Sequence, residues 1–93
     1  MVVGVISWQL SLPGCRSLKE KRMVVRSLKD RIRHRFNVSV AETDHQDVWS
    51  RAEISVAVVT GEVSFAENVL DEVDRLVVGD GRALVSATRR DLY

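Results

Sequence analysis

The 93 residues carry 14 Lys and Arg against 13 Asp and Glu, a formal net charge of +1, and 45% of them are hydrophobic. This length fits one domain, residues 1–93, and the hydrophobic content is too high for a disordered chain. No apolar run reaches the roughly 18 residues of a membrane span, and the N-terminus lacks the basic segment and cleavage site of a signal peptide, so we expect a cytoplasmic protein with no membrane partner.

The first third of the sequence predicts a strand, a turn and a helix. Residues 2–11 alternate between two sets of side chains with a period of two, which is typical of a strand. Residues 12–15 contain a Pro-Gly pair and predict a turn. Ser17 and Glu20 have the spacing of a capping box, which predicts a helix over residues 18 to about 34.

The middle of the sequence predicts two strands joined by a loop or hairpin. Residues 36–42 form the second strand and residues 52–60 the third, with residues 43–50 between them. Both strands alternate with a period of two, so each has an apolar face. The apolar positions are Val38 and Val40 in one strand, and Ile54, Val56 and Val58 in the other.

The last third predicts a helix and a fourth strand. Ser64 and Glu67 suggest a second capping box, the helix runs to about Val78, and Gly79 is typical of a residue just after a helix. Residues 82–90 form the last strand. The predicted core positions of the helix are Phe65, Val69, Leu70, Val73, Leu76 and Val77.

The order of these elements predicts the fold class. A βαββαβ order indicates the ferredoxin-like split fold of the α+β class, in which a four-stranded antiparallel sheet carries two helices on one face. The first and third strands are then central. The residues expected on the open face of the sheet are small and polar: Ser7, Gln9, Ser39, Ala41, Ser55 and Ala57.

The charges are unevenly distributed along the chain. Nine Lys and Arg and only two acids fall within residues 16–35, which gives this segment +7 and the remainder −6. On a helical wheel, the apolar residues of the first helix form one arc, and five cations form an uninterrupted row beside it. We call this row the basic ridge: Lys19, Arg22, Arg26, Lys29 and Arg33.

The basic ridge predicts a non-enzymatic module that binds RNA or the ribosome. Exposed ion pairs contribute only about 0–1 kcal/mol each, so stability is a poor reason to align five like charges. Phosphates along an RNA would reverse their repulsion. An acidic protein partner and a plain solvated face, paired with acids of the second helix, remain alternatives. Those acids are Glu67, Asp71, Glu72 and Asp74.

Two further surfaces offer other functions. The small residues of the open sheet face could pack against a second copy, which would make a dimeric regulatory or scaffolding module. The loop before the third strand gathers acids around a histidine, which is compatible with a metal-dependent enzyme. Its spacing matches neither an EF-hand nor an H-E-x-x-H motif, and we find no P-loop and no G-x-G-x-x-G. The sequence therefore assigns no catalytic residue, no metal and no cofactor.

The same loop has a simpler structural interpretation. Its carboxylates would bond nearby backbone N–H groups, Arg51 would pair with Asp47, and Trp49 would cover the core. It could also add a second contact to a partner. The residues of this second contact or structural loop are Asp44, His45, Gln46, Asp47, Trp49 and Arg51. The metal-dependent alternative would centre on Glu42, Asp44, His45 and Asp47.

The single cysteine, Cys15, cannot form an internal disulfide. It precedes a helix and has Arg16 and Lys19 nearby, features that lower a thiol pKa. No histidine is close in sequence, and an inert loop cysteine is the preferred interpretation.

Two blocks, "RSLKEKR" at residues 16–22 and "FNVSVAE.DHQD.W.RAEI.VAVV" from Phe36 onwards, resemble the YlxP-like family of small bacterial proteins. The resemblance covers nearly the whole chain and implies a ferredoxin-like fold. Members are commonly encoded beside translation-initiation and ribosome-maturation factors, which implies a link to ribosomes or RNA. The family has no settled catalytic residues to carry over to this sequence.

Overall fold

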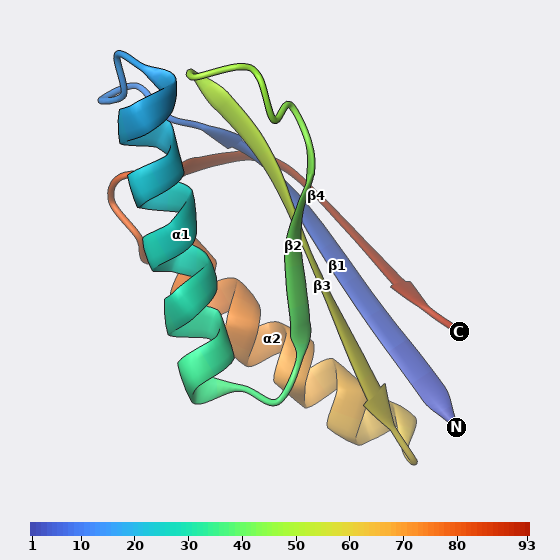
Figure 1. The fold of residues 1–93 in the computed structure, drawn as a ribbon. Coiled ribbons are helices and arrows are strands. Elements are labelled where there is room, and N and C mark those ends of the chain that lie inside the picture. The colour runs from blue at the N-terminus through green and yellow to red at the C-terminus, as the bar shows by residue number, and fades with distance from the viewer.

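Four strands and two helices form in the predicted order, and the computed structural model describes all residues 1–93. The helices and strands lie side by side as two layers, with both helices on one face of the sheet (Figure 1). The elements are β1 (Val2–Ser11), α1 (Leu18–Arg35), β2 (Ser39–Asp44), β3 (Arg51–Thr60), α2 (Val63–Val78) and β4 (Leu84–Leu92). The predicted fold class is confirmed.

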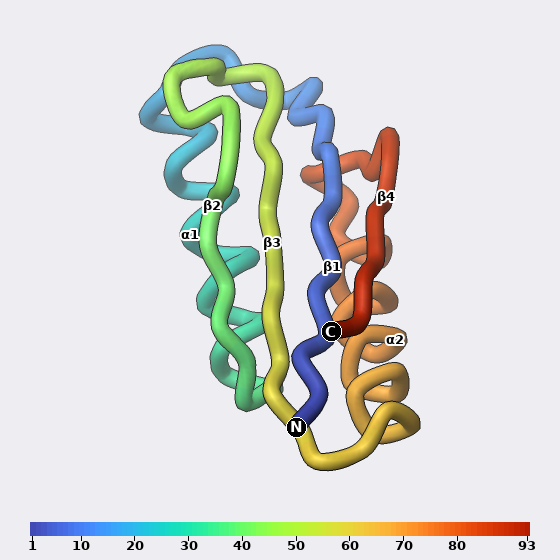
Figure 2. Tube along the Cα trace, turned by 90° about the vertical axis from the view of Figure 1, so that its right-hand side faces the viewer, coloured from blue at the N-terminus to red at the C-terminus, as the bar shows by residue number.

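The sheet is antiparallel throughout and has the order β2-β3-β1-β4. The first and third strands are therefore central, as predicted, and pair over their whole length from Val2 opposite Thr60 to Ser11 opposite Arg51. Helix α1 lies behind β2 and β3, and α2 lies behind β1 and β4 (Figure 2). One edge of the sheet, β2, is thus the strand next to α1.

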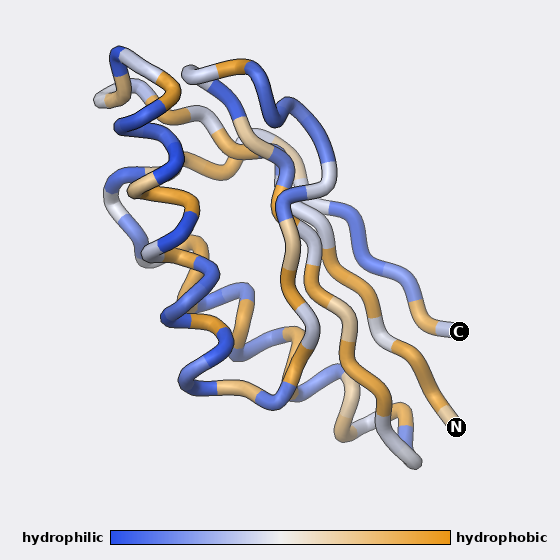
Figure 3. Tube along the Cα trace, in the orientation of Figure 1, coloured by the Kyte–Doolittle hydropathy of each residue, from blue (hydrophilic) through white to orange (hydrophobic).

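The core lies between the sheet and the helices. Alternate residues of β1 and β3 point into it, and hydrophobic residues follow both strands in Figure 3. Trp8 is fully buried, and its indole N–H donates to the carboxylate of Asp74 on α2 at 2.8 Å. Gly4 allows α2 to approach closely, because a Cβ there would lie 3.1 Å from the side chain of Leu70.

The first helix begins as predicted. The hydroxyl of Ser17 accepts from the N–H of Glu20 at 3.1 Å, and the Glu20 carboxylate accepts from the N–H of Arg16 at 2.6 Å. This is a capping box in which the return bond reaches one residue further back than usual. Phe36 ends the helix by donating its N–H to Ile32, so the second strand starts at Ser39 and not at residue 36.

The predicted start of the second helix is wrong. Thr60 bonds to the backbone of Glu62 in both directions, which turns the chain early and makes Glu62 the N-cap, with no side-chain capping bond. Ser64 therefore lies inside the first turn. Phe65 is 58% exposed and does not enter the core, because the small residue Ala66 takes that place in the buried stripe.

The last strand begins at Leu84, two residues later than predicted. Ala83 donates its N–H to the carbonyl of Asp80, which holds residues 80–83 in a turn. Neither helix combines the length and the apolar content that a membrane crossing requires.

The central strand β3 provides a matched pair of substitutions. Ile54 is 0% exposed and Val59 is 66% exposed. We expect Ile54→Ala to lower the free energy of unfolding by about 2–5 kcal/mol, because it leaves a cavity in the core. Val59→Ala should change it by less than about 0.5 kcal/mol. Urea denaturation of the two variants measures the difference, and equal midpoints would contradict the assignment of the buried face.

Candidate nucleic-acid interface

The basic ridge lies on the outer flank of α1, on the side of the free edge of β2. Four of its cations are exposed and Lys29 is half-buried. Lys19, Arg22 and Arg26 share a shallow groove of about 710 Å³ along the helix surface with Met23, Ser27, Asp30 and Arg31. The first helix thus presents several cations on one continuous surface.

Five of the nine Lys and Arg outside the ridge have an anionic partner. Lys21 pairs with Glu42 at 2.8 Å and Arg90 with Asp71 at 2.7 Å. By contrast, no carboxylate lies within ion-pair distance of four members of the ridge, which are Lys19, Arg22, Arg26 and Lys29.

The acids of α2 do not neutralise the ridge. Asp71 pairs with Arg90 on β4, and Asp74 accepts from Trp8. Glu67 and Glu72 are exposed and form no ion pair. The positive charge of four ridge side chains therefore remains uncompensated within the fold.

The buried aspartate Asp80 forms ion pairs with two cations outside the ridge. The carboxylate of Asp80, in the turn before β4, accepts from Arg82 at 2.8 Å and from Arg31 at 3.0 Å. Hydrogen bonds from Arg82 hold the pKa of Asp80 below its usual value, and the same contact raises the pKa of Arg82. This cluster ties α1 to the turn before β4 and removes Arg31 from the free cations.

Arg33 differs from the other members of the ridge. Its guanidinium donates to the carbonyl of Val40 on β2 at 3.2 Å and lies 3.6 Å from Asp30. It therefore has contacts within the fold and is only partly available to a partner. These contacts also fix the position of the ridge relative to β2.

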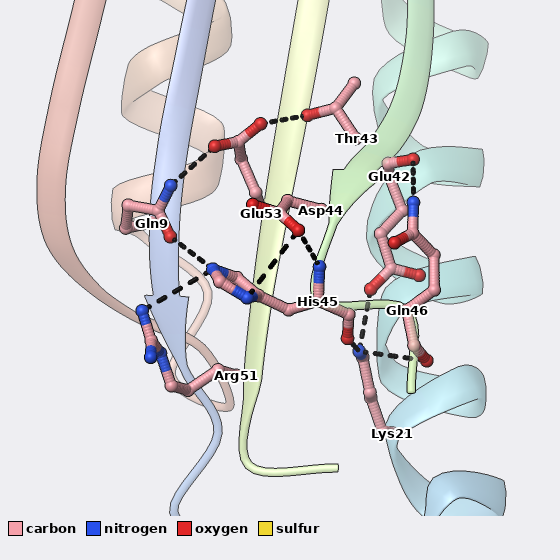
Figure 4. A network of polar contacts seen from close by, with 9 residues as sticks. All are labelled: Gln9, Lys21, Glu42, Thr43, Asp44, His45, Gln46, Arg51 and Glu53. Atoms are coloured by element: carbon pink, nitrogen blue, oxygen red, sulfur yellow. Dashed lines mark hydrogen bonds and ion pairs between the residues drawn. The ribbon is translucent and has the colours of Figure 1, made fainter. Parts of the chain in front are cut away.

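A buried lysine joins α1 to the loop between β2 and β3. Lys21 is 1% exposed, and its ammonium group donates to the carbonyls of His45 and Gln46 (Figure 4). Glu42 Oε2 lies 2.8 Å from Lys21 Nζ, and this ion pair is its only contact, since no hydrogen bond of normal geometry reaches that oxygen. Burying an unpaired charge is costly, so each group requires the other.

The loop owes its shape to these contacts. His45 has a left-handed backbone with φ of 64°, which is unusual for a residue with a side chain. Its N–H donates to Asp44 at 2.7 Å, and its carbonyl accepts from both Lys21 and the N–H of Val48. The buried ammonium therefore helps to hold this backbone conformation.

The histidine also takes part in a hydrogen-bonded network on the open face of the sheet. Gln9 donates to Glu53 at 2.5 Å, so its carbonyl oxygen faces His45 Nε2 at 3.1 Å (Figure 4). The network continues over Thr43 and Ser55 to Ser7. The predicted open-face residues Ser7, Gln9 and Ser55 thus belong to one network, which Thr43 extends from β1 and β3 to β2.

The predicted metal-binding or catalytic cluster in this loop does not assemble. No three His, Cys, Asp or Glu side chains lie close enough together to hold a metal ion. Glu42 points to Lys21, whereas Asp44 bonds to the backbone of His45. Asp44 therefore makes the predicted bond to a nearby backbone N–H, Glu42 pairs with Lys21, and Asp47 makes neither a hydrogen bond nor an ion pair.

Two details of that interpretation are wrong. Trp49 is 47% exposed and does not cover the core. Arg51 lies 3.5 Å from the ring of His45 and forms no ion pair with Asp47. Asp47 is exposed.

Lys21 is the residue that sequence reasoning missed. The signal was present, because position 21 falls in the middle of the buried arc on the helical wheel, where a lysine requires a partner. The identity of that partner could not be read from the sequence, since Glu42 lies 21 positions further along the chain.

Cys15 is buried, and its thiol is less reactive than its position suggests. Burial raises the pKa of Cys15, and the nearby carboxylate of Glu20 raises it further. The thiolate is therefore disfavoured, in agreement with an inert cysteine.

Because of the buried ion pair, we expect the substitution of two lysines of the same helix to have very different effects on the free energy of unfolding. Lys21→Met should lower the free energy of unfolding by about 3–5 kcal/mol, because Glu42 and two carbonyls lose their partner. Lys19→Met removes the same charge from an exposed position and should cost less than about 0.5 kcal/mol. Urea denaturation of both variants tests this, and similar midpoints would refute the structural role of Lys21.

The Asp80 cluster predicts a pH dependence. Because its pKa is lower in the folded chain than in the unfolded chain, Asp80 stabilises the fold above about pH 4, and this contribution is lost as the pH falls through the folded value. We expect Asp80→Asn to cost about 1–3 kcal/mol at pH 7 and progressively less below pH 4. Thermal unfolding from pH 7 to pH 2 measures it, with the exposed Asp47→Asn as control. A penalty that stays constant with pH would contradict the ion pairs.

The comparisons with known proteins agree with this fold. The chain is 32% identical over 72 residues to the "Uncharacterized protein YlxP" of Bacillus subtilis (strain 168), which covers 77% of this chain and 78% of that protein. The solution structure of a de novo designed protein with a ferredoxin fold superposes with a TM-score of 0.51 over 99% of this chain and 84% of its own, at 14% identity, and supports the fold alone. The family described as "Protein of unknown function (DUF503)" matches residues 3–90, and the chain belongs to this family.

Proposed function

We propose that this protein is a non-enzymatic module that binds structured RNA through the basic ridge of α1. The observation that carries the proposal is the set of four cations that have no anionic partner in the fold: Lys19, Arg22, Arg26 and Lys29. Arg33, whose side chain is 51% exposed, completes the row. Ribosomal RNA is the structured RNA that we would test first.

Physical chemistry favours an external anion for these side chains. Like charges three or four residues apart on a helix repel by a few tenths of a kcal/mol per pair. The fold compensates several other cations with Glu42, Asp71 and Asp80 but leaves four of the five ridge cations without such a partner. Phosphates placed along the ridge would turn this repulsion into attraction and release condensed counterions.

RNA is preferred over an acidic protein for two reasons. Three of the five ridge side chains are arginines, and guanidinium groups bind phosphate oxygens in a bidentate manner. Structured RNA is recognised largely through its shape and backbone, which requires cations in a fixed arrangement. A helix that is capped at its start and tied to β2 and to the turn before β4 provides such an arrangement.

Fluorescence anisotropy with a labelled fragment of structured ribosomal RNA tests the proposal at three salt concentrations. Four to five phosphate contacts predict that log K falls with log salt at a slope of about −3.6 to −4.5. The double variant Arg22→Glu/Arg26→Glu should bind at least about tenfold more weakly at 0.1 M salt, and its slope should be flatter by about 1.8.

The matched control is Arg51→Glu/Arg89→Glu, which changes the net charge equally. Both of its positions are exposed and lie on the open face of the sheet, where β3 and β4 pair with β1. Its affinity should remain within about threefold of the original protein. Equal losses in the two double variants would mean that net charge and not the ridge governs binding. Stronger binding to poly-glutamate than to RNA would assign the ridge to an acidic protein.

A further inference from the structure

The ridge is long, straight and evenly charged. From Lys19 to Arg33 it spans about 21 Å along α1, at 1.5 Å per residue. Successive cations are three or four residues apart, a rise of about 4.5–6 Å. The helix that carries them is fixed at several points: its N-cap, the buried Lys21, and Arg31 with Asp80. Such a row suits a stiff partner with regularly spaced charges.

No aromatic side chain accompanies the ridge. Proteins that bind single-stranded RNA stack bases on exposed aromatic rings. Trp8 is fully buried, and Phe36 is half-buried with the guanidinium of Arg35 5.3 Å above its ring.

The other aromatic residues belong to other parts of the molecule. Phe65 lies in the first turn of α2, and Tyr93 is the last residue of the sequence. Helix α2 and the C-terminus lie on the β1–β4 side of the molecule, whereas α1 lies on the β2–β3 side (Figure 2). Trp49, on the loop between β2 and β3, is the one exposed aromatic residue outside these two segments.

The edge of β2 beside the ridge carries backbone groups that point away from the sheet. The carbonyl of Val40 on β2 accepts from Arg33, and the carbonyl of Glu42 accepts from Gln46. Neither donor lies on β3, so both carbonyls point away from that strand. In an antiparallel pair, the N–H of a residue points to the same side as its carbonyl. The backbone N–H groups of both residues therefore point toward the free edge of β2, on the flank where the ridge lies. Val40 is buried and Glu42 is half-buried, so the cations of the ridge remain the main contacts for a phosphate backbone.

We infer that the ridge binds the sugar-phosphate backbone of a double-stranded RNA segment, without stacking on bases. This inference rests on the proposed function and narrows its substrate to duplex RNA. Helix α1 lies along the duplex, its cations contact successive phosphates, and the edge of β2 faces the same backbone. Recognition of this kind depends on the shape of the duplex and is nearly independent of sequence.

Melting of an RNA hairpin with a stem of about 16 base pairs distinguishes the two modes of binding. A protein that prefers the duplex raises the melting temperature of the hairpin, and one that prefers the single strand lowers it. We expect an increase that disappears in Arg22→Glu/Arg26→Glu and persists in Arg51→Glu/Arg89→Glu. A decrease would overturn the inference while leaving ridge-dependent RNA binding intact.

Anisotropy with the hairpin and with an unstructured RNA of the same length provides the second measurement. Duplex binding predicts at least a tenfold preference for the hairpin, and no change in affinity for Trp49→Ala. A tenfold loss in Trp49→Ala, or equal affinity for the two RNAs, would overturn the inference in favour of base stacking. If neither RNA binds in a ridge-dependent manner, the proposed function itself fails.

Discussion

The buried ammonium group of Lys21 connects α1, which carries the basic ridge, to the loop between β2 and β3, which contains His45. It lies on α1, within the stretch that also carries the basic ridge, and bonds to the loop between β2 and β3 through two carbonyls and Glu42. Charge burial of this kind is tolerated only with a well-placed partner. The geometry of the loop, including the left-handed backbone of His45, therefore depends on the helix.

The distribution of anionic partners gives the protein its electrostatic character. Asp80 forms ion pairs with Arg31 and Arg82. Asp71 forms an ion pair with Arg90, and Glu42 forms one with Lys21. The pairs of Asp80 with Arg31, Asp71 with Arg90 and Glu42 with Lys21 each connect two separate elements of the fold. The ridge receives no such partner along most of its length, so four unpaired cations are concentrated on one flank of one helix.

Much of the fold could be predicted from local patterns. The period of two located β1 and β3 to within a residue, and the Ser17 capping box located α1, because these signals depend on neighbours in the sequence. The second helix was misplaced because the bonds between Thr60 and Glu62 start it before Ser64. The ridge itself was visible on a helical wheel. The absence of ion pairs between the ridge and the acids of α2, and the burial of Lys21, depend on tertiary contacts. They could not be established from local sequence patterns.

The free edge of β2 has a consequence for association between copies of the chain. An unprotected edge strand is a template for pairing with another molecule, and continued pairing leads to aggregation. Here Arg33 and Gln46 occupy the outward carbonyls of Val40 and Glu42. Two copies that met at this edge would also bring two rows of unpaired cations face to face. The charges of the ridge would therefore oppose pairing of two copies at this edge, and high salt should weaken that repulsion.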